Sequence, residues 1–272
     1  MRDETMVARQ GVQALEQAFA RAREEGRAAL ITYLTMGYPT LEAALELVPA
    51  LEAGGADIVE LGVPFSDPVA DGPAIQRASY LALQAGMTPA RCLEQVARLR
   101  EAGVRVPLLL MGYYNPIFHY GERSYVRDCR QAGADGLIVP DLPPEEADEL
   151  MDACRQEGLA LVFLAAPTTG PERLREIAGR STGFLYVISR LGTTGAERRF
   201  DMEELRRRLA EVRRASPIPV AVGFGVSTPE QARALVGLAD GIIVGSAVVE
   251  RAVNGAAALR EYVAGLRAAL RQ

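Results

Sequence analysis

GADIV, at residues 55–59, is the stretch from which the fold can be inferred, because it recurs twice in the chain. The second copy reads GADGLIV at 133–139 and the third reads LADGIIV at 238–244. Each copy has a small residue that can end a helix, an aspartate in the turn, and an apolar run that predicts a buried strand. Self-similar units of this kind are typical of a fold built from duplicated strand–helix modules.

The same alternation of strand and helix continues along the whole chain. Eight apolar runs predict strands, and a helical pattern follows each of them. The predicted strands are 28–34, 57–62, 106–111, 136–139, 159–164, 183–188, 218–222 and 241–244. Eight such units in about 250 residues predict a single α/β domain over 1–272, a (β/α)8 TIM barrel with an extra N-terminal helix at 12–25. An open doubly wound sheet is the alternative, because it uses the same units.

The composition is that of an ordinary globular protein and argues against several functions. The 272 residues are 49% hydrophobic and carry a net charge of −5, which disfavours a general binder of nucleic acid or anionic membranes. No apolar run is long enough to cross a bilayer, and the N-terminus lacks the order of a signal peptide, so we expect a cytoplasmic protein. The three cysteines lie far apart in predicted helices, without the spacing of a metal site or disulfide framework.

One acidic side chain lies inside a predicted strand. Alternation along 57–62 places Glu60 on the same face as the apolar Ile58. A carboxylate among core residues is costly unless it has a partner or a chemical role. The loop after this strand presents Asp67 and Asp71, and barrels gather their chemistry on such loops. Glu60 and Asp71 are therefore candidate catalytic residues, and the alternative for Glu60 is a rim residue paired with an arginine.

Two glycine-containing turns predict a phosphate site. GFG at 223–225 follows the seventh predicted strand, and Gly245-Ser246 follows the eighth at the start of a helix. Glycines let backbone N–H groups approach an anion, and barrels frequently hold a phosphate between these two loops. Gly195, in the loop after the sixth strand, is a candidate third element of this cradle. Ordinary turn glycines are the alternative interpretation.

The absence of lysine narrows the chemistry. All 30 basic side chains are arginine, so no Schiff base can form on this chain. His119 is the only histidine, and no cluster of carboxylates and histidines indicates a metal site. General acid–base catalysis by carboxylates remains, and Glu60 and Asp71 could divide it if their surroundings separate their pKa values. We expect the pKa of Glu60 to be raised by its apolar surroundings.

Residues 60–73, ELGVPFSDPVADGP, resemble the signature of the tryptophan synthase α chain family. The resemblance covers most of the chain. The further matching segments are 75–76, 111–116, 141–143, 189–190, 194–195 and 223–225. It implies a carbon–carbon lyase of tryptophan biosynthesis that cleaves indole-3-glycerol phosphate, by a retro-aldol reaction without a cofactor, to indole and glyceraldehyde 3-phosphate.

The resemblance assigns catalytic roles by position. Glu60 matches the acid–base residue, which would protonate indole C3 and then take the proton of the glycerol hydroxyl next to the breaking bond. Asp71 matches the acid that holds the indole N–H and stabilises the positive indolenine. Tyr186 matches the tyrosine beside the catalytic glutamate. Asp141 is expected to support a loop, with a direct contact to substrate as the alternative.

The resemblance also assigns binding roles. The residues expected to bind the substrate phosphate are Gly195, Gly225, Gly245 and Ser246. The residues expected in the indole pocket and the lid are Phe65, Tyr113, Thr194 and Phe224, with core packing as the alternative for the three aromatic rings. The lid departs from the usual family pattern, because Leu191 follows Arg190 and Thr193 precedes Thr194.

Asp67 and Pro68 lie where the family's loop touches its β subunit, and a plain turn is the alternative. The resemblance implies that this partner carries pyridoxal phosphate, consumes the indole and forms an α2β2 tetramer with the α chain, which itself holds no cofactor or metal. Three other functions stay open from the residues alone. They are a phosphosugar isomerase, a free-standing lyase of the same substrate, and a non-catalytic phosphate-ligand module that activates the β subunit.

Overall fold

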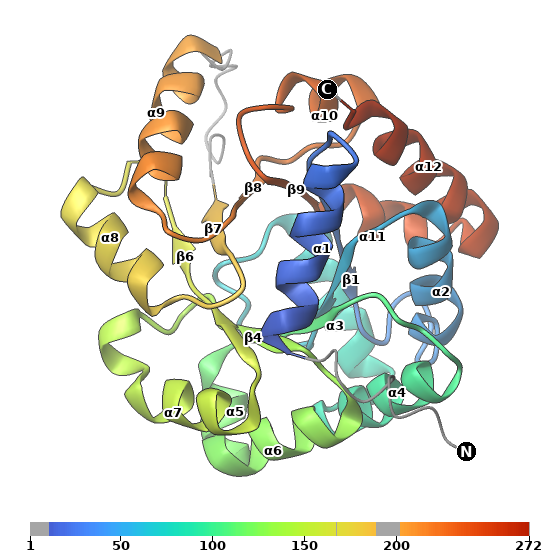
Figure 1. Ribbon diagram of the computed structural model, residues 1–272. Coiled ribbons are helices and arrows are strands. Elements are labelled where there is room, and N and C mark those ends of the chain that lie inside the picture. The colour runs from blue at the N-terminus through green and yellow to red at the C-terminus, as the bar shows by residue number, and fades with distance from the viewer. Residues whose placement is uncertain (1–10, 167, 189–201, 272) are drawn as a thin grey trace, which may run out of the picture.

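The computed structural model describes residues 11–166, 168–188 and 202–271, and it shows a barrel of strands enclosed by helices (Figure 1). The strands are β1 (Ala29–Thr35), β2 (Ile58–Gly62), β3 (Leu108–Met111), β4 (Gly136–Ile138), β5 (Ala160–Val162), β6 (Leu164–Ala165), β7 (Leu185–Ile188), β8 (Val220–Gly223) and β9 (Gly241–Val244). The helices are α1 (Val12–Glu24), α2 (Ala44–Gly54), α3 (Pro73–Gln84), α4 (Pro89–Glu101), α5 (Tyr114–Tyr120), α6 (Glu122–Ala132), the 3₁₀ turn η2 (Pro144–Glu146), α7 (Asp148–Glu157), α8 (Pro171–Arg180), α9 (Met202–Ala215), α10 (Pro229–Ala234), α11 (Ser246–Ala252) and α12 (Gly255–Ala269). None of the described helices is long and apolar enough to cross a membrane.

The order of the strands identifies a closed barrel. All the pairs are parallel, in the order β5-β4-β3-β2-β1-β9-β8-β7-β6. The first and last strands of the chain, β1 and β9, are neighbours, as closure of a barrel requires. At the two ends of the order are β5 and β6, which only Phe163 separates. The predicted TIM barrel is therefore confirmed, and the open-sheet alternative is wrong.

The predicted strand 159–164 is divided into β5 and β6, because side-chain hydroxyls take the place of some of the backbone hydrogen bonds to a neighbouring strand. The backbone N–H of Leu161 donates to Thr182 Oγ1 at 2.8 Å, and that of Phe163 donates to Ser181 Oγ at 3.0 Å. These hydroxyls satisfy donors that a neighbouring strand would otherwise satisfy. The barrel thus closes between β5 and β7 through a serine and a threonine that precede β7.

Helix α1 fills the N-terminal end of the barrel. In Figure 1 it lies across the middle of the ring of strands. Its apolar face is fully buried, and the Phe19 ring lies 5.5 Å from that of Phe184, inside the barrel. The helix start is anchored by the N–H of Gly11, which donates to Asp135 Oδ1 at 2.8 Å. The predicted N-terminal helix is confirmed, and it leaves the carboxyl ends of the strands for the polar residues of the loops.

The aspartate of each sequence repeat has the same structural role. It immediately precedes a strand, accepts the backbone N–H at the start of the preceding strand, and pairs with an arginine. The aspartates with their amide donors are Asp57 with Leu30 at 2.8 Å, Asp135 with Leu108 at 2.9 Å, and Asp240 with Val220 at 2.9 Å. Their arginine partners are, in the same order, Arg27, Arg100 and Arg213. The repeat therefore ties neighbouring strands together at the amino end of the barrel.

Candidate active site

Strand β2 carries Glu60 into the interior of the barrel. The residue is 0% exposed, and its register neighbours are Tyr33 of β1 and Leu109 of β3. Within the described ranges, neither carboxylate oxygen has a hydrogen-bond partner. Burial raises the pKa of Glu60 to about 8, because an apolar interior disfavours the charged form. The expected rise in pKa is confirmed, and Glu60 is not a residue of the rim.

Two tyrosines lie close enough to Glu60 to sense its charge. Burial and then the carboxylates of Asp71 and Glu60 raise the pKa of Tyr33, and burial and then Glu60 raise that of Tyr186, so both phenols stay neutral. Each ring lies over a glycine of the next strand. A Cβ on Gly62 would be 1.9 Å from Tyr33 Oη, and a Cβ on Gly223 would be 3.1 Å from Tyr186 Oη.

Sequence reasoning identified Tyr186 but missed Tyr33. The sequence did contain a hint, because Tyr33 lies in the mostly apolar run 28–34, two residues after the core residue Ile31 and therefore on the same face of the strand. Its importance depends on pairing with β2, which the local sequence does not show. The structure adds Tyr33 to the groups around Glu60.

A phenol holds Asp71 in place. Tyr113 Oη donates to Asp71 Oδ2 at 3.1 Å and accepts the N–H of Ala70 at 2.9 Å. The Tyr113 ring packs on Phe65, with 5.2 Å between ring centroids, and Gln76 Nε2 donates to the Asp71 carbonyl at 3.0 Å. The loop after β2 is therefore braced by the segment between β3 and α5 and by α3. Tyr113, which was expected to line a pocket, also orients the second carboxylate.

The glycine turns lie beside these groups. Because β8 and β9 are paired, the turns after them are adjacent, and Gly225 has a φ of 66°, where glycine is favoured. A Cβ on Gly245 would be 3.6 Å from Tyr33 Cβ, and one on Gly72 would be 4.0 Å from Ser246 Oγ. The structure thus brings the predicted phosphate turns next to the Asp71 loop. Gly195 and Thr194 lie outside the described residues.

The structure also places the remaining predicted residues. Phe224 is partly buried and packs against the core between the barrel and its helices. Asp141 Oδ1 accepts the N–H of Tyr114 at 2.9 Å, which confirms that Asp141 supports a loop by holding the start of α5. The structure also has a short helix, α5, directly after β3, where the sequence analysis predicted no separate element. His119, near the end of α5, is exposed.

A groove of about 550 Å³ runs along the outer side of the loop after β2. It is lined by Phe65, Ser66, Asp67, Pro68, Val69, Gln76, Tyr80, Leu83 and Gln84. Two large apolar side chains beside it are unusually exposed, Val69 at 73% and Tyr80 at 62%. Phe118, on α5, is 66% exposed. Asp67 and Pro68 therefore border an apolar surface that a monomer would leave in water.

The arrangement suits acid–base chemistry on a small phosphorylated molecule. A buried carboxylic acid with a pKa near 8 is protonated at neutral pH and can donate a proton. A second acid, braced by a phenol, lies at the mouth of the barrel beside amides suited to an anion. In the part of the chain that the structure describes, no group of three or more histidine, cysteine, aspartate or glutamate side chains could hold a metal.

Comparison with known proteins adds independent evidence. A sequence model of the family described as tryptophan synthase alpha chain matches residues 19–271. The tryptophan synthase alpha chain of Roseiflexus sp. (strain RS-1) is 51% identical over 253 residues, covering 92% of this chain and 95% of the relative, and that of Chloroflexus aggregans is 47% identical over 258 residues, covering 95% and 96%. A solved structure of Mycobacterium tuberculosis tryptophan synthase superposes with a TM-score of 0.87 at 40% identity, covering 95% of this chain and 98% of that one.

Proposed function

The chain belongs to the tryptophan synthase α chain family, and from this premise we propose that it cleaves indole-3-glycerol phosphate into indole and glyceraldehyde 3-phosphate. The observation that carries the proposal is the state of Glu60, which is completely buried, without a partner among the described residues, and protonated at neutral pH. Such a residue destabilises the fold, and its chemistry accounts for its presence.

The first step is protonation of the indole ring. Glu60 transfers its proton to C3, and the ring becomes a positively charged indolenine. Asp71, held by Tyr113, accepts a hydrogen bond from the indole N–H and stabilises this charge. The neutral phenols of Tyr33 and Tyr186 keep the surroundings of Glu60 uncharged, which favours the acid form that starts the reaction.

The second step breaks the bond between C3 and the glycerol carbon. Glu60, now a carboxylate, takes the proton of the hydroxyl on that carbon. The hydroxyl oxygen forms the aldehyde, and the bonding electrons return to the ring and neutralise the indolenine. Glu60 ends the cycle protonated, so no lysine, metal or cofactor is needed.

The substrate phosphate is assigned to the turns after β8 and β9. Backbone amides near Gly225, Gly245 and Ser246 would bind it, and Gly195 would complete the site. Phe65 and Phe224 are assigned to the indole pocket and Thr194 to the lid, as the family pattern suggests. Anchoring the phosphate would place the indole end of the substrate toward Glu60 and Asp71.

The name of the family and the apolar groove beside Asp67 and Pro68 support a partner for this chain. That partner would be the β subunit, which would hold pyridoxal phosphate and consume the indole, within an α2β2 tetramer in the cytoplasm. A chain that delivers indole to a partner needs an exposed docking surface close to its own site. Val69 and Tyr80 provide apolar area at this position.

The experiment that tests the function is indole release by the purified chain, with and without the β subunit. We expect slow release alone and a large increase with β. Glu60→Gln should lower kcat by at least about 10³-fold in both conditions, because an amide cannot exchange protons. Substrate binding, measured by calorimetry, should persist because the amide keeps the shape of the acid.

The three alternatives left open by the sequence give different results in the same assay. A phosphosugar isomerase would turn over its substrate without releasing indole. A free-standing lyase would release indole at an unchanged rate when β is added. A non-catalytic module would release no indole by itself, and its Glu60→Gln variant would stimulate β as well as the wild type does. A Glu60→Gln variant with a near-normal rate would contradict the assignment of Glu60.

A further inference from the structure

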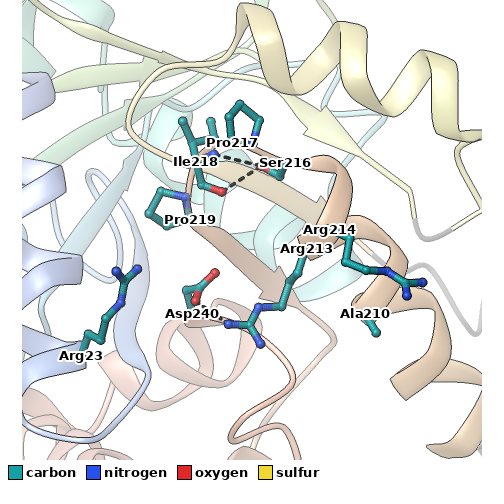
Figure 2. Close-up of a pocket in the computed structure, with 9 residues that line it drawn as sticks. All are labelled: Arg23, Ala210, Arg213, Arg214, Ser216, Pro217, Ile218, Pro219 and Asp240. Atoms are coloured by element: carbon teal, nitrogen blue, oxygen red, sulfur yellow. Dashed lines mark hydrogen bonds and ion pairs between the residues drawn. The ribbon is translucent and has the colours of Figure 1, made fainter.

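Charged side chains outside the proposed active site hold elements together at both ends of the barrel. At the amino end, a hollow of about 550 Å³ is lined by Arg213 and Asp240, which pair with each other at 2.9 Å (Figure 2). Asp240 also accepts the N–H of Val220, so this pair links strands. A different contact follows β3, where Glu122, the first residue of α6, bonds to the first residue of α5.

Glu122 is a buried carboxylate whose partner is a phenol. It is only 8% exposed, and its Oε1 accepts a hydrogen bond from Tyr114 Oη at 3.1 Å. Glu149 of α7, which pairs with Arg123 at 3.6 Å, faces the same carboxylate. Burial raises the pKa of Glu122, and the bond from Tyr114 opposes this rise. The bond to Tyr114 therefore offsets part of the cost of burying this acid.

Helix α5 depends on other elements to hold its start. It has only seven residues, contains Pro116, and has no side-chain cap from Tyr113, the residue before it. A helix this short is marginal by itself. Two acids from other elements hold its first residue, since Asp141 accepts the backbone N–H of Tyr114 at 2.9 Å and Glu122 accepts its phenol. The positions of residues 113 and 114 are therefore set by tertiary contacts.

Tyr113 connects this anchored residue to the proposed active site. Its hydroxyl donates to Asp71 Oδ2 at 3.1 Å and accepts the N–H of Ala70 at 2.9 Å. Because consecutive residues share a rigid peptide plane, a shift in the backbone of Tyr114 also moves Tyr113. Two consecutive tyrosines thus link Glu122, on an outer helix, to the carboxylate that is proposed to stabilise the indolenine.

We propose that Glu122 is a positioning residue for the cleavage reaction, on the basis of the function proposed above. Its bond fixes Tyr114 and hence Tyr113, which in turn holds Asp71. Without this bond, Tyr114 keeps the backbone contact to Asp141 but loses the anchor of its side chain. A displacement of about 1 Å can lower a rate by about 10²-fold, so we expect a partial loss of order to lower kcat by about tenfold. KM should change by less than about twofold, because the substrate phosphate is assigned to other turns.

The test compares indole release by four variants of the purified chain with the β subunit present. Tyr114→Phe and Glu122→Ala remove the bond, and each should lower kcat by about tenfold. Glu122→Gln keeps an oxygen that accepts the same bond, and its kcat should stay within about twofold of wild type. The matched control is Tyr120→Phe, which removes a bond of 2.8 Å to Asp128 between the same two helices, at the other end of α5. Its kcat should also stay within about twofold of wild type.

A double-mutant cycle shows whether the effect passes through Tyr113. In the Tyr113→Phe background the bond to Asp71 is already lost, so Tyr114→Phe should lower kcat by less than about twofold more. A further tenfold fall would show that Tyr114 acts on the fold in general and would overturn the proposal. A wild-type kcat for Tyr114→Phe, or an equal loss in Glu122→Gln and Glu122→Ala, would also overturn it.

A second measurement does not depend on activity. A wild-type chain that released no indole would refute the proposed function, whereas the link from Glu122 to Asp71 can be judged from crystal structures of the wild type and Tyr114→Phe. We expect the distance from Tyr113 Oη to Asp71 Oδ2 to exceed about 3.5 Å in the variant, beyond the range of a hydrogen bond. An unchanged distance would show that Glu122 does not position Asp71.

Discussion

Glu60, the proposed acid–base residue, also has a cost in stability. The folded chain keeps its proton up to about pH 8, whereas an unfolded chain loses it near the ordinary value of 4.5. The folded state therefore binds more protons between these values, so stability falls as the pH rises through this range. One pKa unit corresponds to about 1.4 kcal/mol, which makes the penalty at pH 7 about 3 kcal/mol.

Glu60→Gln should therefore stabilise the protein while it abolishes turnover. We expect the free energy of unfolding in urea to rise by about 3 kcal/mol at pH 7, and the gain to vanish as the pH approaches 4.5, where both side chains are neutral. The control is Glu101→Gln, an exposed residue at the end of α4, which should change stability by less than about 0.5 kcal/mol. A gain that does not depend on pH would show that burial of the charge is not its cause.

Tyr113 offers a second test at the residue scale. Tyr113→Phe removes the hydroxyl that donates to Asp71 and accepts from Ala70. Because Asp71 is proposed to stabilise a positive ring, we expect kcat/KM for indole release to fall by about 10- to 100-fold, the effect of losing one charged hydrogen bond. Tyr120→Phe loses a similar bond, to Asp128 at 2.8 Å, away from the site. The result would be negative if both variants lost the same activity.

The sequence predicted some of these residues and not others, for a physical reason. Strand alternation was enough to place Glu60 inward, because that rule is local. Tyr33 was missed because its proximity to Glu60 depends on the pairing of β1 with β2. The Tyr113–Asp71 bond spans 42 positions of the chain, and no local pattern encodes it.

At the scale of elements, each repeated aspartate links its own strand to a neighbouring strand through a hydrogen bond. Asp135 is the most buried of them, with a side chain that is 2% exposed, and it receives bonds from Gly11, Leu108 and Arg100. This one carboxylate therefore ties α1, β3 and α4 to the start of β4. The contacts explain why an aspartate, which forms strands poorly, recurs in front of buried strands.

Asp135→Ala should consequently be severely destabilising. We expect a loss of about 3–5 kcal/mol in the free energy of unfolding, because Arg100 and two backbone donors would be left without their partner. Asp152→Ala, which breaks an exposed pair with Arg155, should cost less than about 1 kcal/mol. Urea denaturation measures both variants. A double-mutant cycle with Arg100→Ala separates the contribution of the ion pair from that of the bonds to backbone amides. A small loss of stability for Asp135→Ala would show that this carboxylate does not hold the neighbouring elements together.

The elements themselves were largely predictable, and the exceptions have identifiable causes. The repeats, the apolar runs and the N-terminal helix led to the barrel correctly. The division into β5 and β6 was not predictable, because it depends on Ser181 and Thr182, some 20 residues further along. Helix α5 was missed because its short sequence contains Pro116 and several aromatic residues, and its start depends on a bond from Asp141.

In the whole molecule, the contacts that stabilise the fold and the groups proposed for catalysis lie at opposite ends of the barrel. The amino end holds α1 and the three aspartate–arginine pairs, and the carboxyl end holds Glu60, Asp71 and the glycine turns. Substitutions at the amino end should therefore change unfolding more than turnover, as is usual for this fold. Three of the most exposed apolar residues, Val69, Tyr80 and Phe118, lie in the segments that follow β2 and β3.

Tyr80 allows the proposed partner surface to be tested without changing the groups proposed to be catalytic. It is 62% exposed on α3 and lines the groove beside Asp67 and Pro68. If the β subunit covers this groove, Tyr80→Ser should leave indole release by the isolated chain within about twofold of wild type, but raise the β concentration needed for half-maximal stimulation by about tenfold or more, since buried aromatic anchors dominate such interfaces. Val253→Ser is the matched control, because Val253 is 57% exposed between α11 and α12 and does not line the groove. If both variants respond to β equally, the β subunit does not bind at this groove. If only Tyr80→Ser needs more β, the groove is part of the interface, and the β subunit binds close to the proposed site of indole formation.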